Sequence, residues 1–177
     1  MNREDGITVV IPAYGPVEIV TRSVYSAVSA YRGKNSKYKL EVLIYADDRE
    51  YEKENEGKSQ YDYYLTPEFQ KLIEKPELTE IKVIHNLEVY GEHIYQGGAR
   101  LEGLNNSKHK LVCLIDCDDV LAPSFIVQAL DIYNSEAVKC PIFRIGAGHL
   151  SFDENGYQKN VGNSIWVQAY AWNSDFV

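Results

Sequence analysis

Cysteines are few and follow no pattern, with Cys113, Cys117 and Cys140 the three among 177 residues. An odd number without a Cys-x-x-Cys pair does not indicate a disulfide framework or a zinc site, so we expect reduced thiols and a cytoplasmic protein. The start of the chain shows no apolar signal segment. No apolar run approaches the roughly 20 residues of a membrane-spanning helix, so we expect no membrane span.

Positive charge is also scarce, because 18 Lys and Arg stand against 26 Asp and Glu for a net charge of −8. Nucleic acids and anionic membranes are bound by cationic surfaces, so this balance argues against both as partners. The Gly-x-Ser-x-Gly, Gly-x-Gly-x-x-Gly and P-loop signatures are absent. The four histidines show no carboxylate at helical spacing, and we expect none of them to be a ligand.

Apolar segments alternate with helical patterns along the first two thirds of the chain. Predicted strands lie at 7–11, 40–45, 81–84, 111–115 and 142–145, and predicted helices at 16–31, 67–75, 96–106 and 123–133. Strands that are apolar at nearly every position are typical of a parallel sheet buried on both faces. The alternation predicts an α/β fold with an open, mostly parallel (mixed) sheet flanked by helices. We expect a solvated loop at 49–60 and a hairpin turn at 153–156.

Ligands of such sheets bind at the carboxyl ends of the strands. Here these ends are residues 12–14, 46–48, the residues after Ile84, and Asp116-Cys-Asp-Asp119. Three carboxylates within four residues repel one another, and Mg²⁺ or Mn²⁺ is their natural partner. A helix cap or a turn would need one carboxylate, not three.

Three further signals are weaker, because each has an ordinary structural explanation. The pair Asp47-Asp48 ends another strand, where aspartates also form turns. Arg100 lies in the first turns of a helix and fits an anion site, or a surface ion pair with Glu102 or Asp119. Tyr14 follows the first strand and fits a stacking platform, or a half-buried surface residue.

Five landmarks then follow one another in a recognisable order. They are Ile7-Thr-Val-Val-Ile-Pro-Ala-Tyr14, Leu43-Ile-Tyr-Ala-Asp-Asp48, Ala99-Arg-Leu-Glu-Gly103, Leu114-Ile-Asp-Cys-Asp-Asp-Val-Leu-Ala-Pro123 and an aromatic segment over 165–176. Together they resemble the family-2 glycosyltransferases with the GT-A fold. The resemblance implies a Rossmann-like nucleotide-binding half over 1–119 and the start of an acceptor-side half over 120–177, truncated at the C-terminus.

The resemblance also implies a role for each matched residue. Ala13 and Tyr14 would hold the base, Asp47 would accept its imide N–H, Arg100 would reach the base or the diphosphate, Asp116 would approach the ribose, and Asp118 would bind the metal. Pro12 and Cys117 would complete the nucleotide-sugar site, with Asp116 as a second metal ligand and Mn²⁺ or Mg²⁺ as cofactor. The implied donor is a nucleotide-diphosphate sugar, UDP-linked by preference.

The implied reaction is an inverting transfer to a hydroxyl of a saccharide, lipid-linked or protein acceptor. Its general base would lie beyond Val177, so the catalytic residue is unknown. The family usually has asparagine where this chain has Gly15 and Leu101. Two alternatives stay open. One is a nucleotide-sugar-binding or scaffold module without turnover. The other is a haloacid-dehalogenase-like phosphohydrolase with Asp116 as nucleophile, although Asp119 replaces the glycine of that motif.

Overall fold

A computed structural model describes residues 3–31, 38–47, 59–73, 79–134, 142–145, 151–152, 158–159 and 169–173. The strands are β1 (Glu4–Ala13), β2 (Lys39–Ala46), β3 (Thr79–His85), β4 (His109–Leu114), β5 (Ile142–Ile145), β6 (Ser151–Phe152), β7 (Gln158–Lys159) and β8 (Ala169–Asn173). The helices are α1 (Val17–Tyr31), α3 (Gln60–Leu65), α4 (Pro67–Ile73), α5 (Asn86–Tyr90), α6 (Tyr95–Asn106) and α7 (Phe125–Asn134). The predicted α/β fold class is confirmed.

The main sheet has the strand order β3-β2-β1-β4-β8-β5, and its first four strands are parallel. β8 runs antiparallel to both β4 and β5, so the sheet is mixed, as predicted. The chain leaves β1 to form β2 on one side and returns to form β4 on the other. This change of direction beside β1 is the position where open α/β sheets bind ligands.

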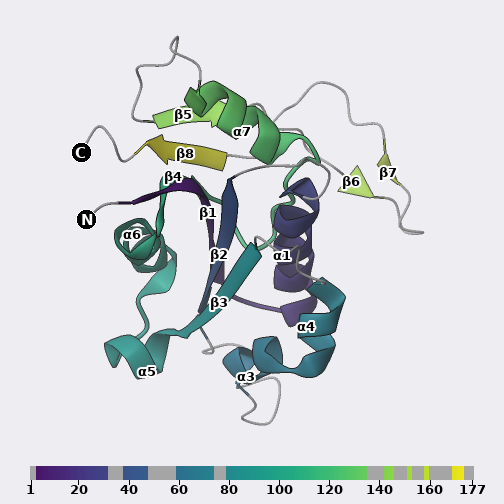
Figure 1. Cartoon of the computed structure of the whole chain (residues 1–177). Helices are drawn as coiled ribbons and strands as arrows, with labels where there is room; N and C mark the ends of the chain where they lie inside the picture. Colours follow the sequence, from purple (N-terminus) through teal and green to yellow (C-terminus); the bar gives the residue numbers. More distant parts are fainter. Residues whose placement is uncertain are drawn as a thin grey trace.

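Helices cover both faces of the sheet, as Figure 1 shows. Ile7, Val9 and Ile11 of β1 belong to the larger core, together with apolar side chains of α1, α4 and α7. Val10 of β1 points to the opposite face, where it packs with Ala99 of α6 and apolar residues of β2 and β4. The alternation along β1 therefore buries both faces of the strand, as the continuous apolar run predicts.

Helix α6 approaches β1 at a glycine. A Cβ atom placed on Gly103 would lie 2.3 Å from Cγ1 of Val10, closer than any carbon–carbon contact allows. The absence of a side chain at Gly103 thus sets the distance between α6 and the sheet. Because α6 also carries Arg100 and Gln96, this close contact positions part of the candidate site.

Several elements differ from the sequence-based expectations. Helices α3 and α5 were not predicted, because each is too short to show a helical period. Helix α5 brings Glu88 within 3.3 Å of Nδ1 of His85, so the expectation that no histidine has a carboxylate at helical spacing is wrong. The predicted turn at 153–156 lies outside the described residues, although β6 and β7 on either side of it pair antiparallel.

A buried polar chain crosses the opposite end of the sheet from the strand carboxyl ends. The Thr8 hydroxyl donates to Oε2 of Glu41 at 2.8 Å, and Nδ1 of His109 lies 3.1 Å from the same hydroxyl oxygen. Since the hydroxyl has one proton and gives it to Glu41, Nδ1 of His109 must be the donor to Thr8. Burial lowers the pKa of His109, which favours its neutral form.

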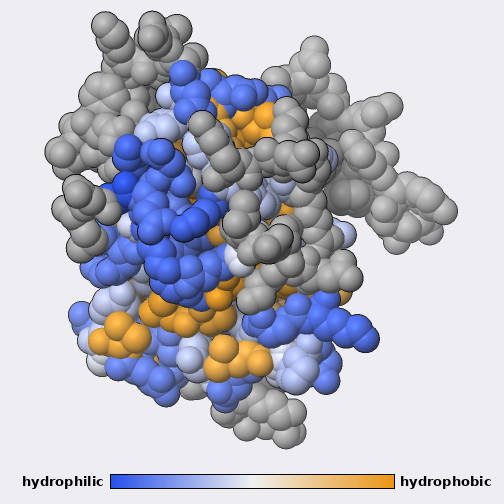
Figure 2. All heavy atoms as spheres, in the orientation of Figure 1, coloured by the Kyte–Doolittle hydropathy of each residue, from blue (hydrophilic) through white to orange (hydrophobic). Residues whose placement is uncertain are grey.

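Among the coloured atoms of Figure 2, polar side chains predominate, and apolar side chains gather in the lower part of the view and over α7. Leu87 and Val89 of α5 are exposed. No helix in the described part of the chain has the length and apolar character needed to cross a bilayer.

Candidate functional site

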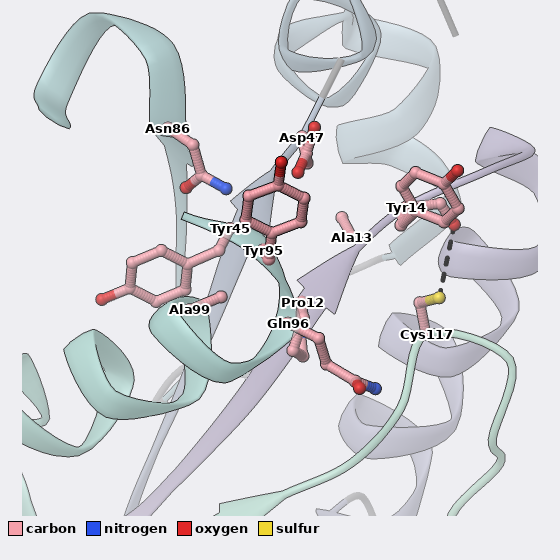
Figure 3. A pocket seen from close by; sticks show the side chains of 10 residues that line it. All are labelled: Pro12, Ala13, Tyr14, Tyr45, Asp47, Asn86, Tyr95, Gln96, Ala99 and Cys117. Atoms are coloured by element: carbon pink, nitrogen blue, oxygen red, sulfur yellow. Dashed lines mark hydrogen bonds between the residues drawn. The ribbon is translucent and has the colours of Figure 1, made fainter. Parts of the chain in front are cut away.

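A pocket of about 320 Å³ opens at the carboxyl ends of the parallel strands. Its walls come from the ends of β1 and β2, the start of α5, the first turns of α6 and the loop after β4, as Figure 3 shows. The lining residues are Pro12, Ala13, Tyr14, Tyr45, Asp47, Asn86, Tyr95, Gln96, Ala99 and Cys117. The pocket has the location and the size of a small-molecule site in an open α/β sheet.

The first wall is the turn that ends β1. Pro12 and Ala13 are buried, whereas 45% of the Tyr14 surface is exposed at the pocket. The backbone N–H of Asp47 donates to the Ala13 carbonyl at 3.0 Å, which continues the pairing of β1 with β2 to its last residue. An exposed ring on a hydrogen-bonded turn can stack on a flat ligand.

Two nearly buried polar side chains also line the pocket. Asp47 is 5% exposed and Asn86 is 1% exposed, and both line the pocket. Nδ1 of His93 lies 3.1 Å from Oδ1 of Asp47 but is not aligned for a hydrogen bond. Oδ1 of Asn86 has no hydrogen-bond partner among the described residues, and Figure 3 shows the amide nitrogen directed toward the pocket. An amide nitrogen that faces a pocket can donate a hydrogen bond to a ligand.

The acidic loop after β4 is held in shape by helix α1. The Asp119 N–H donates to the Asp116 carbonyl at 3.1 Å, which closes a turn. The Ser23 hydroxyl of α1 donates to the carbonyl of Cys117 at 2.7 Å and contacts the carbonyl of Asp119. Serine is a poor residue for a helix interior, and here its value lies in this tertiary contact. The loop is therefore fixed before any ligand binds.

Asp116 is engaged by two donors from α6. Its Oδ1 accepts from Nε2 of Gln96 at 2.7 Å and forms an ion pair with the Arg100 guanidinium. Gln96 also lines the pocket, so it connects the pocket to the acidic loop. The sequence offered Glu102 or Asp119 as partners of Arg100, and the structure selects Asp116 instead.

The charge of the loop is only partly neutralised by Arg100. Burial and the neighbouring carboxylates Asp116 and Asp118 raise the pKa of Asp119. Burial likewise raises the pKa of the Cys117 thiol, whose Sγ lies 3.3 Å from the Tyr14 carbonyl oxygen. Crowded carboxylates of this kind are stabilised by an additional cation.

The described residues contain no cluster of three or more His, Cys, Asp or Glu side chains that could enclose a metal ion alone. Asp116 and Asp118 could supply two oxygen ligands, which is the usual protein contribution to Mg²⁺ bound together with phosphates. Their oxygen donors and the excess negative charge fit such an ion. A metal at this loop would therefore share its coordination with the ligand.

The structure brings most of the sequence-predicted residues together. One pocket is lined by Pro12, Ala13, Tyr14, Asp47 and Cys117. Beside it, Arg100 pairs with Asp116, and the lining residue Gln96 donates a hydrogen bond to Asp116. Asp118 is exposed and follows the pocket-lining Cys117, but it is not itself part of the lining. Asp48 and Asp175 lie outside the described residues.

Sequence reasoning missed five lining residues, namely Tyr45, Asn86, Tyr95, Gln96 and Ala99. Asn86 directly follows β3, so the rule for strand ends indicated its position but not its chemistry. Tyr95 begins α6 with φ of 54°, a left-handed conformation that no sequence signal announced.

No family model matches the chain, and no curated protein matches it. Among solved structures, the chain is similar to the crystal structure of S. aureus TarS 1-349, with a TM-score of 0.42 and 14% sequence identity. The match covers 82% of this chain and 42% of that chain, so this chain spans less than half the length of that structure. A likeness of this degree assigns no residue roles, and the function rests on the geometry of the pocket.

Proposed function

We propose that the pocket binds the nucleotide part of a nucleotide-diphosphate sugar, and that the protein transfers the sugar to a hydroxyl acceptor. The observation that carries the proposal is that Tyr14, Asp47 and Cys117 of the acidic loop line one pocket, from three different strand ends. A nucleotide base needs a flat surface on which to stack, and its polar edge needs a buried hydrogen-bond acceptor. A metal-bound diphosphate needs a loop that carries carboxylates.

The polar groups of the pocket favour a uracil base. The imide of uracil offers an N–H donor between two carbonyl acceptors. The Asp47 carboxylate can accept from the N–H, and the Asn86 amide can donate to a neighbouring carbonyl, with the Tyr14 ring against the face of the base. Each contact would use a polar or aromatic group that lines the pocket. UDP is therefore our preferred nucleotide.

The diphosphate belongs at the loop after β4. Asp118 and Asp116 would hold Mn²⁺ or Mg²⁺, which when bound neutralises the charge of the leaving diphosphate. Arg100 adds a fixed positive charge beside the loop, already oriented by its ion pair with Asp116. A guanidinium held in advance loses little conformational entropy when an anion binds.

Transfer with inversion also needs a carboxylate that deprotonates the acceptor hydroxyl. We assign this role to none of the described lining residues, because Asp47 would be engaged by the base and lies against His93. The acceptor, whether a saccharide, a lipid-linked sugar or a protein, would bind to parts of the protein outside this pocket. A nucleotide-sugar-binding module without turnover is the second candidate, because donor binding requires only the residues described above.

The direct test is a thermal unfolding screen of UDP, GDP and dTDP with Mn²⁺ or Mg²⁺. UDP with Mn²⁺ should raise the melting temperature, and Asp118→Ala should abolish the increase. Asp131→Ala, which removes an exposed aspartate from α7, is the matched control and should leave it unchanged. If no nucleotide shifts the transition with either metal, the proposal is wrong.

A second assay separates the candidate activities. Release of UDP from UDP-sugars in the presence of acceptors would favour the transferase over the binding module. Phosphate release from a generic phosphoester, lost in Asp116→Asn, would favour a phosphohydrolase instead.

A further inference from the structure

The turn at the end of β1 is tied by three separate segments. The carbonyl of Ala13 accepts from the Asp47 N–H at 3.0 Å, and the carbonyl of Tyr14 lies 3.3 Å from the Cys117 thiol. The carbonyl of Gly15 accepts from Nε2 of Gln60 at 2.7 Å. Asp47 and Cys117 belong to the pocket, whereas Gln60 is the first residue of α3 and is not a lining residue.

Gln60 is an unusual residue for its place. Its side chain is fully buried, and its Oε1 has no hydrogen-bond partner among the described residues. A buried amide oxygen without a partner is destabilising, and an apolar side chain of the same length would avoid that penalty. The value of a glutamine at this position therefore lies in the bond from Nε2 to the Gly15 carbonyl.

That bond acts on the part of the turn that is least constrained otherwise. Gly15 has φ of +84°, a left-handed conformation in which its own side chain gives no packing, and a Cβ atom there would meet nothing within 4 Å. The Tyr14 ring precedes this residue and is 45% exposed. The hydrogen bonds to the turn hold the backbone from which the ring projects.

We infer that Gln60 is a positioning residue for nucleotide binding, which holds the Tyr14–Gly15 turn so that the Tyr14 ring meets the base at a fixed angle. The inference rests on the proposed function, and it adds a residue outside the pocket to the determinants of base binding. Gln60 acts through the backbone of the turn and contacts no ligand itself.

The test measures the dissociation constants of UDP and of inorganic pyrophosphate, each with Mn²⁺, by isothermal titration calorimetry. Gln60→Met keeps the length of the side chain but removes the donor. It should bind UDP about tenfold more weakly, the scale of one lost hydrogen bond, and bind pyrophosphate as the wild type does. If the methionine variant does not fold, Gln60→Asn replaces it, because its amide is too short to reach the Gly15 carbonyl. It should show the same weaker binding of UDP and unchanged binding of pyrophosphate.

Gln70→Met is the matched control, because Nε2 of Gln70 also donates to a backbone carbonyl, that of Tyr64, at 2.9 Å and away from the turn. It should leave both constants unchanged. In a Tyr14→Ala background, Gln60→Met should have no further effect on UDP. An equal loss for UDP and pyrophosphate, or the same loss without the Tyr14 ring, would overturn the inference. If the wild type itself binds no nucleotide, the proposed function fails first, so the two failures are distinguishable.

Discussion

Replacing Gly103 by alanine should destabilise the protein, although alanine is the better helix former. In a helix interior alanine is more favourable than glycine by about 1 kcal/mol. Against this gain, the new methyl group would lie 2.3 Å and 2.7 Å from the two Cγ atoms of Val10 and 3.0 Å from its Cβ. Favourable carbon contacts need about 3.5–4.0 Å, so one of the two elements must move by about 1 Å.

Val10 cannot easily give way, because it is fully buried on β1, and β1 is hydrogen-bonded to strands on both sides. Overpacking of this kind typically costs about 1–3 kcal/mol, and a contact this short belongs in the upper part of that range. The net loss in the free energy of unfolding should be about 1–2 kcal/mol. The shift of α6 should also move Arg100 and Gln96 away from Asp116 and weaken UDP binding.

Urea unfolding with linear extrapolation measures the effect. Gly97→Ala is the control, because it lies in the same helix and an added Cβ there would meet nothing within 4 Å. That variant should gain up to about 1 kcal/mol. Equal stability of the two alanine variants would refute the close contact between α6 and β1.

Three further predictions concern the buried polar chain and the acidic loop. Because burial lowers the pKa of His109 below 6.5, the unfolded chain takes up a proton before the folded chain does, so stability should be full above about pH 6.5 and fall below it. Urea midpoints should show this fall, and it should shrink in His109→Gln; an undiminished fall would assign it to other groups. Ser23→Ala leaves the Cys117 carbonyl without its donor and should lower stability by about 1–3 kcal/mol in thermal unfolding. Ser29→Ala, which removes a buried hydroxyl without a hydrogen-bond partner among the described residues, should cost much less, and equal losses would count against the anchoring role of Ser23. Asp116→Asn removes the ionic partner of Arg100 and should weaken UDP–Mn²⁺ binding in calorimetry by about tenfold or more, whereas Asp131→Asn should not; unchanged affinity in Asp116→Asn would remove Asp116 from the site.

The parts of the fold that sequence reasoning anticipated are those with a strong local pattern. β1, β2 and β4 are apolar at nearly every position, and α1 has an apolar stripe of helical period, so their types and approximate bounds follow from the residues alone. The rule that ligands bind at strand carboxyl ends then located the pocket. It placed Tyr14, Asp47 and the loop at Asp116 together without any knowledge of distances.

The missing parts depend on contacts between distant segments. Gln60 and Gly15 are 45 residues apart, and no local pattern relates them. The pairing of Arg100 with Asp116 rather than Glu102 follows from the packing of α6 on β1, which the sequence signals only through Gly103. Helix α5 spans five residues, which is fewer than two turns, so the sequence shows no helical period there. The position of Asn86 at the pocket could therefore not be predicted.

The central claim is that the pocket binds the base of the nucleotide while the acidic loop binds its diphosphate through a metal ion. A crystal structure of the protein with UDP and Mn²⁺, with the manganese located by its anomalous signal, tests it most directly. We predict the uracil against the Tyr14 ring within hydrogen-bonding reach of Asp47, and the ion between Asp118 and the phosphates. A nucleotide bound elsewhere, or an ion away from the acidic loop, would contradict the account.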